Sequence, residues 1–236
     1  MYNEEKVIGT YLENLSYFLK SSGEKYEVVI LDDGSTDKSY DIVKNFTGLN
    51  VNLLKHDKNQ GVGAAVRHLF AYVCEKANPD DIIFTMDSDN THDPKYIDIM
   101  IKKIREGYDL VIASRYADEG GEVGFSAFRS LLSKGTRLTM QLFFPIKNVR
   151  DYSCGYRAYK ADIIKKTIEK FGENTFTTNG FTCYVEFLIK ANMTNGLKVA
   201  EVPLVLRYDL KKSASKLKVF KTIREYIMLI YKLKFR

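Results

Sequence analysis

Tryptophan is absent from this sequence of 236 residues, and proline (four), cysteine (three) and histidine (three) are scarce. No two cysteines form a Cys-x-x-Cys pair, so the sequence argues against a zinc site and predicts free thiols in a reducing compartment. The histidines are scattered, and we expect each to be a surface or core residue rather than a metal ligand. The cysteines are Cys74, Cys154 and Cys183, and the histidines are His56, His68 and His92.

Long apolar runs are also missing. No stretch approaches the roughly 18 residues that a helix needs to cross a bilayer, and the longest one near the end runs from Tyr226 to Tyr231. The chain opens with Tyr2-Asn3-Glu4-Glu5 and lacks an apolar core segment there, so we expect no signal peptide.

Composition and charge fit a soluble globular protein. Hydrophobic residues make up 45% of the chain and charged residues 28%, and this length suffices for one α/β domain with a core of its own. The net charge of +6 suits nucleic acid, an anionic membrane surface or a phosphorylated ligand. Because no nucleic-acid-binding motif accompanies the charge, we expect no nucleic acid partner.

Strand-like and helix-like segments alternate in the first half of the chain. Continuous apolar strands in a βαβα order indicate a parallel sheet covered by helices on both faces. We expect strands at 27–32, 51–56, 81–86 and 109–114, and helices at 36–46, 61–77 and 94–105.

The pattern changes after Arg115. We expect a loop at 117–124, a helix at 125–144, a strand at 199–206 and a polar loop at 208–215. The last segment, 216–236, has the spacing of an amphipathic helix and carries seven Lys or Arg against one acid, Glu225. The sequence therefore predicts one α/β domain over residues 1–215, followed by a basic amphipathic helix.

Asp87-Ser88-Asp89 follows the apolar strand at 81–86. Ligands in open α/β sheets gather beyond the carboxyl ends of the strands, and Mg²⁺ is commonly held by one or two carboxylates together with substrate phosphates. The motif thus suggests a nucleotide-dependent enzyme, although an acidic turn at the end of a strand would have the same sequence.

Further motifs follow one another along the chain. They are YNEE (2–5), LDDGSTD (31–37), NQGVGAA (59–65), MDSD (86–89), SRY (114–116), Arg129 with Ser133, DYSCGYR (151–157), EVP (201–203) and SASK (213–216). Over nearly the whole chain this order resembles the family 2 glycosyltransferases, which have a GT-A (Rossmann-like) α/β fold. The Arg115, Arg129/Ser133 and Ser-x-Ser-Lys elements are similar to those of the dolichol- and polyprenyl-phosphate sugar synthases within that family.

The resemblance implies roles at a donor site. Asp33, with Tyr2 and Glu4, would help to hold a nucleotide, although the Asp-Asp-Gly-Ser sequence also suits a turn and a helix cap. Gly61 would let the backbone approach the ligand closely at a helix start, and Ser88 would line the same site. Asp87 and Asp89 would bind Mg²⁺ or Mn²⁺, with Thr91 in the place where the lipid-phosphate synthases often have a glutamine.

The resemblance also implies an acceptor site. Arg115, Arg129 and Ser133 would bind the phosphate of the acceptor lipid, because the planar donor fork of arginine matches phosphate. Without the resemblance, Arg129 would be interpreted as a solvated charge on an amphipathic helix. Arg207 and Lys216 would close over the diphosphate, whereas Lys211 and Lys212 would be ordinary surface charges.

The implied activity is inverting transfer of mannose or glucose from GDP-mannose or UDP-glucose to dolichyl or polyprenyl phosphate. The basic helix at 216–236 would rest on the inner face of the membrane, which makes the protein cytoplasmic and peripheral. The helix at 125–144 would either face the lipid chain or pack in the core, and the sequence leaves both open.

The chain departs from the family pattern at its first residues. Relatives have an apolar strand that leads directly into the Tyr-Asn-Glu motif, whereas Met1 already stands inside it. The resemblance thus implies a sheet that lacks its usual first strand. We expect a form extended by about ten residues to be more stable.

Three other interpretations remain open. Residues 87–91 (DSDNT) also resemble the DxDxT nucleophile motif of haloacid-dehalogenase-type phosphatases, although an acidic pair at 32–33 precedes the motif here and the order is the reverse of theirs. The acceptor could be a glycan or a protein instead of a lipid phosphate. A chain without the first strand could also bind nucleotide without turnover.

Overall fold

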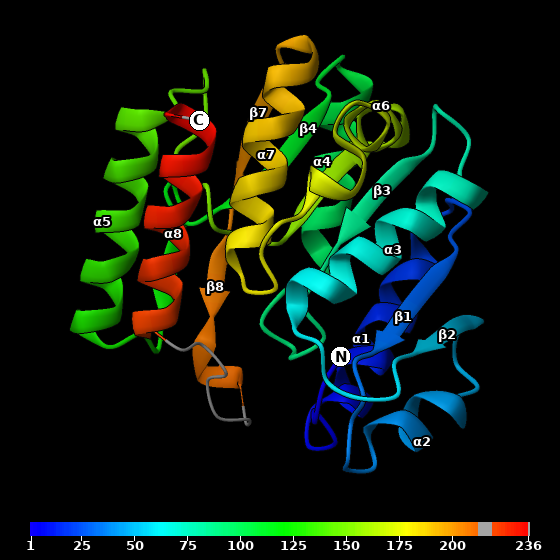
Figure 1. Cartoon of the computed structure of the whole chain (residues 1–236). Coiled ribbons are helices and arrows are strands. Elements are labelled where there is room, and N and C mark those ends of the chain that lie inside the picture. The colour runs from blue at the N-terminus through cyan, green and yellow to red at the C-terminus, as the bar shows by residue number, and fades with distance from the viewer. Residues whose placement is uncertain (212–218, 236) are drawn as a thin grey trace.

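The structure is a computed structural model, and it describes residues 1–211 and 219–235. Helices cover both faces of a layer of strands (Figure 1). The helices are α1 Ile8–Ser21, α2 Ser39–Lys44, α3 Val62–Lys76, α4 Ile97–Arg105, α5 Ala127–Phe143, α6 Ala161–Phe171, α7 Thr182–Asn195 and α8 Val219–Lys234, with short 3₁₀ turns at Pro94–Tyr96, Gly172–Thr175 and Tyr208–Leu210. The strands are β1 Val28–Asp32, β2 Val51–Lys55, β3 Ile82–Thr85, β4 Leu110–Ser114, β5 Gly121–Val123, β6 Arg157–Lys160, β7 Val199–Pro203 and β8 Val205–Arg207.

The predicted elements of the first half are all present, as β1 to β4 and α2 to α4. Two predictions for the second half were wrong. The segment 117–124 is not entirely loop, because it contains β5. The segment 199–206 is not one strand. Its first part, β7, pairs with β4. After Leu204, where β4 has ended, its second part, β8, pairs with β5.

The sheet confirms an α/β architecture that is parallel only in part. β1 and β2 pair in parallel, as do β4 and β7, and β5 and β8. The four-stranded sheet has the order β3-β6-β4-β7, and β6 runs antiparallel between β3 and β4. The sequence interpretation did not include β6. The predicted parallel arrangement does not hold at β6, which makes this sheet mixed.

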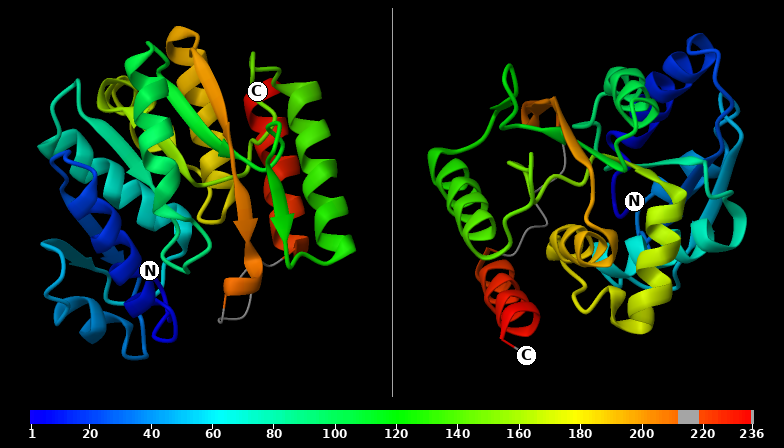
Figure 2. Two further views of the ribbon diagram at one scale, coloured as in Figure 1. Left: turned by 180° about the vertical axis from the view of Figure 1, so that it is seen from behind. Right: turned by 90° about the horizontal axis from the view of Figure 1, so that it is seen from above.

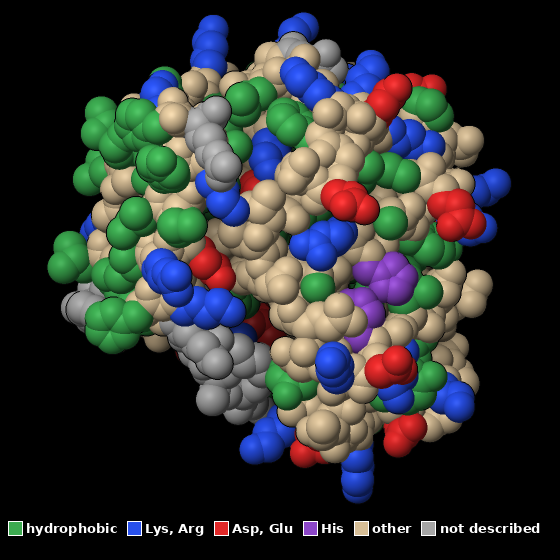
Figure 3. Space-filling view, viewed as in Figure 1, with side chains coloured by type: hydrophobic (Ala, Val, Ile, Leu, Met, Phe, Trp, Pro, Cys, Tyr) green, Lys and Arg blue, Asp and Glu red, His purple; other side chains and the backbone are tan. Residues whose placement is uncertain are grey.

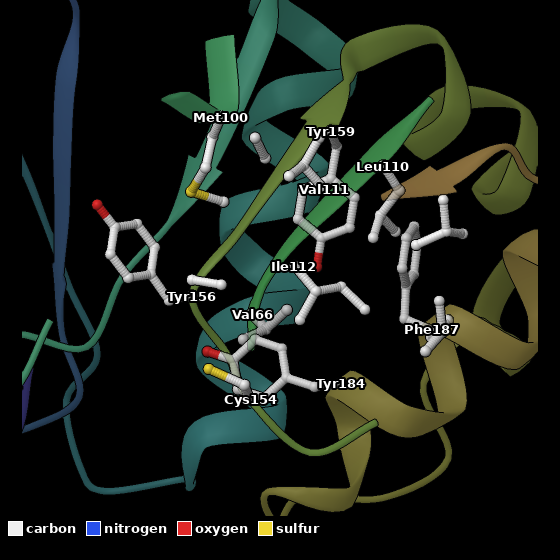
Figure 4. Close-up of a cluster of buried hydrophobic side chains, with 14 of the residues drawn as sticks. Val66, Met100, Leu110, Val111, Ile112, Cys154, Tyr156, Tyr159, Tyr184 and Phe187 are labelled. Carbon is white, nitrogen blue, oxygen red and sulfur yellow. The ribbon is translucent and has the colours of Figure 1, made fainter. Parts of the chain in front are cut away.

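The core lies between the four-stranded sheet and its helices (Figure 4). All four residues from Leu110 to Ala113 of β4 are fully buried, because helices cover both faces of this strand. Phe187 of α7 packs against Phe70 of α3 and Tyr159 of β6, with ring centroids 4.9 and 5.7 Å away. Burial of a large apolar side chain stabilises the fold by about 1.5–3 kcal/mol, so this cluster fixes α3 and α7 against β6.

The sheet is interrupted between β1 and β3. β1 pairs with β2 on one edge, and β3 pairs with β6 on one edge. Within the two described ranges, no strand pairs with the other edge of either.

Helices α5 and α8 stand side by side at one end of the molecule (Figures 1 and 2). Their outer faces carry large exposed apolar side chains, which form part of the hydrophobic area on the left of Figure 3. These residues are Leu131, Leu138, Leu142, Phe220, Ile223, Ile227, Met228 and Tyr231. Among the residues that the structure describes, no helix is long and apolar enough to cross a membrane.

Candidate active site

A cavity of about 1530 Å³ opens between β1 and β3 and extends past the carboxyl ends of both strands. It brings together most of the residues expected at the donor site. Arg115, Arg129, Ser133, Thr91 and Arg207 are not among its lining residues, and Lys216 lies outside the described residues. The expected residues that line the cavity are Tyr2, Glu4, Asp33, Gly61, Asp87, Ser88 and Asp89.

Asp33 joins two loops at the floor of the site. Its buried carboxylate accepts hydrogen bonds from the backbone N–H of Gln60 (2.9 Å) and Gly61 (2.8 Å) and from the side-chain amide of Asn59 (3.0 Å). The Nδ1 atom of His56 lies 2.7 Å from the same carboxylate. The Asp-Asp-Gly-Ser turn therefore fixes the loop that precedes α3.

Gly61 occupies a position that only glycine fits well. Its φ of +92° is a backbone conformation that L side chains rarely adopt, and an added Cβ would lie 2.6 Å from the backbone oxygen of Asn179. The close neighbour of Gly61 in the structure is the backbone of the loop before α7. The expected close approach of a ligand to this helix start stays a prediction.

Asp87 and Asp89 leave the carboxyl end of β3 and reach the wall of the cavity. Thr91 donates to Asp89 Oδ1 from its hydroxyl (2.6 Å) and its backbone N–H (3.1 Å). The backbone N–H of Asp87 donates to Nδ1 of buried His92 at 2.9 Å. The turn after β3 thus orients both carboxylates. In this structure Thr91 positions Asp89.

Lys211 brings a positive charge to Asp89, and its assignment as an ordinary surface charge was wrong. Its Nζ lies 2.5 Å from Asp89 Oδ2, and its side chain is only 12% exposed. The contact joins residues 122 positions apart. Lys212 lies outside the described residues.

The two carboxylates have opposite pKa shifts. Burial raises the pKa of Asp87 above its ordinary value, against the opposing effect of His92. Burial would also raise the pKa of Asp89, but Lys211 and then His92 outweigh it and hold that pKa below its ordinary value. A further positive charge bound next to Asp87 would therefore lower the electrostatic cost of keeping both carboxylates ionised.

The carboxylate oxygens at the cavity wall suit a hard divalent cation that also binds the substrate. No group of three or more His, Cys, Asp or Glu in the described part of the chain could enclose a metal ion. The protein supplies two oriented carboxylates at a cavity wall, and an ammonium group already rests on one of them. Mg²⁺ and Mn²⁺ commonly take such a pair together with phosphate oxygens.

Arg115 lies in a second cluster beyond the end of β4. All five of its N–H groups are donated: two to Asp151 (2.8 Å each), two to Ser133 and Ser153, and one to Glu122 (3.0 Å). Asp151 is fully buried, and Arg115 outweighs the effect of that burial and holds the pKa of Asp151 below its ordinary value. The expected neighbours Arg115 and Ser133 do meet, at 3.1 Å.

Arg129 projects from the same helix as Ser133, one turn earlier. Its guanidinium donates to the hydroxyl of Tyr208 (2.7 Å) and lies 4.3 Å from the Tyr208 ring centroid and 4.7 Å from that of Phe125. Arg207 makes a bidentate pair with Asp209 and is not at the cavity. Tyr208 therefore connects α5 to the segment that carries Lys211.

Sequence reasoning missed Lys211, His92, His56 and Tyr208. The position of His92, five residues after Asp87 in a turn at the end of a strand, could have indicated its contact. The other three make contacts between residues at least 23 positions apart, which only the fold brings together.

Among curated proteins, the chain is 29% identical over 234 residues to the dolichol-phosphate mannosyltransferase of Pyrococcus furiosus, covering 98% of this chain and 61% of the relative. It is 30% identical over 234 residues to an uncharacterized protein of Methanocaldococcus jannaschii, covering 96% of this chain and 88% of that protein. It is 27% identical over 179 residues to the undecaprenyl-phosphate 4-deoxy-4-formamido-L-arabinose transferase of Edwardsiella ictaluri, covering 75% of this chain and 52% of the relative. The chain thus spans between half and two thirds of the two relatives with a named activity.

A solved structure with the same fold is glucosyl-3-phosphoglycerate synthase from Mycobacterium tuberculosis, crystallised with Mn²⁺, UDP-glucose and phosphoglyceric acid. Its TM-score is 0.68 at 19% identity, covering 98% of this chain and 76% of that one. The likeness confirms the GT-A glycosyltransferase fold. The family description "Glycosyl transferase family 2" matches residues 1–168. The chain belongs to glycosyl transferase family 2.

Proposed function

We propose that this chain is a metal-dependent inverting glycosyltransferase that moves mannose or glucose from a nucleotide sugar to dolichyl or polyprenyl phosphate. The observation that carries the proposal is the placement of Asp87 and Asp89 at the wall of the large cavity, next to the loops held by Asp33. The relatives named for transfer involving dolichol phosphate and undecaprenyl phosphate support a lipid-phosphate acceptor.

At the donor site, Asp87 and Asp89 hold Mg²⁺ or Mn²⁺. When bound, the metal offsets negative charge on the nucleoside diphosphate as it leaves. Tyr2, Glu4 and Ser88 line the cavity around the nucleotide. GDP-mannose and UDP-glucose are both candidate donors.

The acceptor phosphate is already ionised, so the reaction needs no strong general base. A phosphate oxygen attacks the anomeric carbon of the sugar, and the bond to the nucleoside diphosphate breaks on the opposite face, which inverts the configuration. The residues of the protein act by positioning the reactants and stabilising charge.

At the acceptor site, Arg129 and Ser133 bind the lipid phosphate. Both stand on one face of α5, and Tyr208 contacts the guanidinium of Arg129. Arg115 has each N–H engaged within the protein, so it acts on the acceptor through Ser133. Arg207 and Lys216 belong to the segment around the polar loop and would close over the diphosphate.

The exposed apolar side chains of α5 and α8 contact the membrane on its inner face. Leu138 and Leu142 of α5 and Phe220 and Ile227 of α8 are each at least 61% exposed, which favours lipid contact over core packing for the outer face of α5. Each Lys or Arg near anionic lipid adds about 1 kcal/mol, and α8 carries four such residues between 219 and 234.

A sugar-transfer assay tests the proposed reaction. Purified polyprenyl phosphate, Mg²⁺ or Mn²⁺ and a panel of radiolabelled nucleotide sugars are incubated with the wild-type chain and with D89N, R129A and R150A variants. Arg150 is a half-exposed arginine that pairs with exposed Asp118 and serves as the matched control.

We expect label in the lipid phase from the wild type and R150A, and none from D89N or R129A. Label in a water-soluble acceptor would assign another family 2 activity. Nucleotide binding without any transfer would assign a binding module instead.

Membrane contact is tested separately by liposome flotation with vesicles that contain anionic lipid. We expect the wild type to float and a double F220S/I227S variant to remain in the bottom fraction. Equal flotation of the two forms would contradict the assignment of this surface.

A further inference from the structure

Arg137 of α5 is a partly buried arginine close to the proposed acceptor site. It stands four residues after Ser133, and Ser133 stands four residues after Arg129, so the three side chains lie along one face of the helix. Four residues span about 6 Å along a helix axis. Arg137 therefore begins one turn beyond Ser133 on the face that carries the acceptor site.

Tyr116 brings the guanidinium of Arg137 close to Ser133. The Tyr116 hydroxyl lies 2.7 Å from Ser133 Oγ, and the Tyr116 ring centroid lies 4.8 Å from the guanidinium carbon of Arg137. Long side chains on a helix point toward its N-terminus, so Arg137 points back over the turn that carries Ser133. Arg129 points the same way, toward the ring of Tyr208. Of these two arginines, Arg137 is the one directed toward Ser133.

The guanidinium of Arg137 has hydrogen-bonding capacity that the protein does not use. In the described part of the chain it contacts the Tyr116 ring, and its buried Nε atom has no hydrogen-bond partner there. A buried donor without an acceptor is costly. Because the planar donor fork of arginine matches phosphate oxygens, a phosphate that accepts from this group would be stabilised beside Ser133.

The charges around Ser133 also call for a further cation. Arg115 has all five N–H groups engaged and contacts two acids, Glu122 and Asp151. Its positive charge is more than balanced, so it does not by itself attract another anion. Arg137 brings a further positive charge to the same serine. A phosphate bound at Ser133 thus depends on the arginines of α5 for charge compensation.

We propose that Arg137 binds the phosphate of the acceptor lipid together with Ser133 and Arg129. This inference rests on the proposed lipid-phosphate acceptor. The next residue, Leu138, is 65% exposed and belongs to the apolar outer face of α5. Arg137 therefore lies at the border between the polar cluster and the surface assigned to the membrane, which suits a polar phosphate on an apolar isoprenoid chain.

Binding of farnesyl phosphate, a short isoprenoid phosphate, tests this role without sugar transfer. Wild type, R137Q and K134Q are titrated with farnesyl phosphate by isothermal titration calorimetry. Lys134 is an exposed residue of the same helix, so K134Q removes an equal charge and serves as the matched control. We expect R137Q to weaken binding at least about tenfold, because it removes charged hydrogen bonds to the phosphate, and K134Q to change it less than about twofold.

A second readout uses the folded wild type alone. The Nε–H signal of Arg137 in ¹H–¹⁵N spectra, assigned by its absence from R137Q or R137K, should move downfield when farnesyl phosphate is added. Inorganic phosphate at the same concentration separates the two sources of the ligand. A shift with farnesyl phosphate alone assigns a lipid phosphate, and a shift with both assigns recognition of phosphate itself; either result supports the role of Arg137.

Equal affinity of R137Q and K134Q for farnesyl phosphate would overturn the proposal. An Arg137 signal that farnesyl phosphate leaves in place, or no binding by the wild type at millimolar concentration, would do the same. The KM for polyprenyl phosphate separates this result from failure of the proposed reaction. Transfer with an unchanged KM in R137Q overturns this inference alone, whereas Arg137-dependent binding without any transfer overturns the proposed reaction alone.

Discussion

Arg115 and Arg129 provide a sharp test of the acceptor site, because both are arginines near Ser133 and only one is built into the core. Substitution by methionine keeps much of the side-chain volume and removes the guanidinium. We expect R115M to lose more stability than R129M, and we expect R129M to lose activity at a temperature where it is folded.

The magnitudes follow from the contacts. Arg115 is 7% exposed and pairs with Asp151, which is 0% exposed, so R115M leaves a buried carboxylate unpaired. Removing one partner of such a pair costs about 3–5 kcal/mol, which lowers the Tm of a domain of this size by roughly 6–20 °C. R129M loses contacts with Tyr208 and Phe125 worth about 1 kcal/mol each, or roughly 4–8 °C.

Circular dichroism melts at pH 7 measure the two shifts. The control is the R150M variant, which loses an exposed pair with Asp118 and a hydrogen bond to the carbonyl oxygen of Tyr116, with an expected loss of about 1 kcal/mol. The transfer assay is then run well below the lower Tm. If R115M melts within about 2 °C of the R150M control, a difference of at most about 1 kcal/mol for a domain of this size, the reasoning about the buried pair is refuted.

The pH dependence of the Tm difference between wild type and R115M tests the same reasoning. The pKa of Asp151 lies below its ordinary value, so the stability that this carboxylate contributes is present above its unfolded pKa and is lost as the pH falls through the folded pKa. In R115M, burial without Arg115 raises the pKa of Asp151, and protonation removes the unpaired charge. The Tm difference between wild type and R115M should therefore shrink between pH 7 and pH 4. A constant difference would contradict this cause.

Three further outcomes are expected. K211M removes the ammonium group from Asp89, so Mn²⁺ should bind at least tenfold more tightly, measured by isothermal titration calorimetry in the presence of a nucleoside diphosphate; weaker binding would show that Lys211 helps to hold the ligand. D87N should reduce transfer by at least about 10³-fold while the Tm rises or stays constant, because the pKa of Asp87 shows that its charge is unfavourable in this place. G61A should lower the Tm by several degrees, since its Cβ would lie 2.6 Å from Asn179 O in a left-handed conformation; an unchanged melt would show that the two loops can move apart.

The sequence predicted β1 to β4 and α2 to α4 because largely apolar strands alternate with helices there, but it did not reveal α1. It did not reveal β6, whose first residue, Arg157, is a fully buried charge. Arg157 donates to the carbonyls of Tyr152, Cys154 and Tyr184, and this set of partners cannot be inferred from the sequence pattern of a strand. The antiparallel position of β6 between β3 and β4 therefore required the structure.

The sequence anticipated the clustering of the expected donor-site residues at the cavity better than the position of the expected acceptor-site residues, for a physical reason. Asp33, Gly61 and Asp87 each follow or precede a regular element, so their place at one edge of the sheet follows from the strand order. Arg129 and Ser133 lie on a helix after the pattern changes. Their relation to the cavity depends on how α5 packs, which the sequence does not specify.

Lys211 connects these two sites, and the connection has a consequence for the order of binding. Its ammonium rests on Asp89 at the donor site, and three residues earlier Tyr208 contacts Arg129 at the acceptor site. A metal-bound nucleotide that takes the place of the ammonium must move Lys211 away from Asp89. Residues 208–210 form one short 3₁₀ turn that ends next to Lys211, and we expect movement of Lys211 to be passed through this turn to Tyr208 and to the surroundings of Arg129. Donor binding should therefore precede and prepare the binding of the acceptor phosphate.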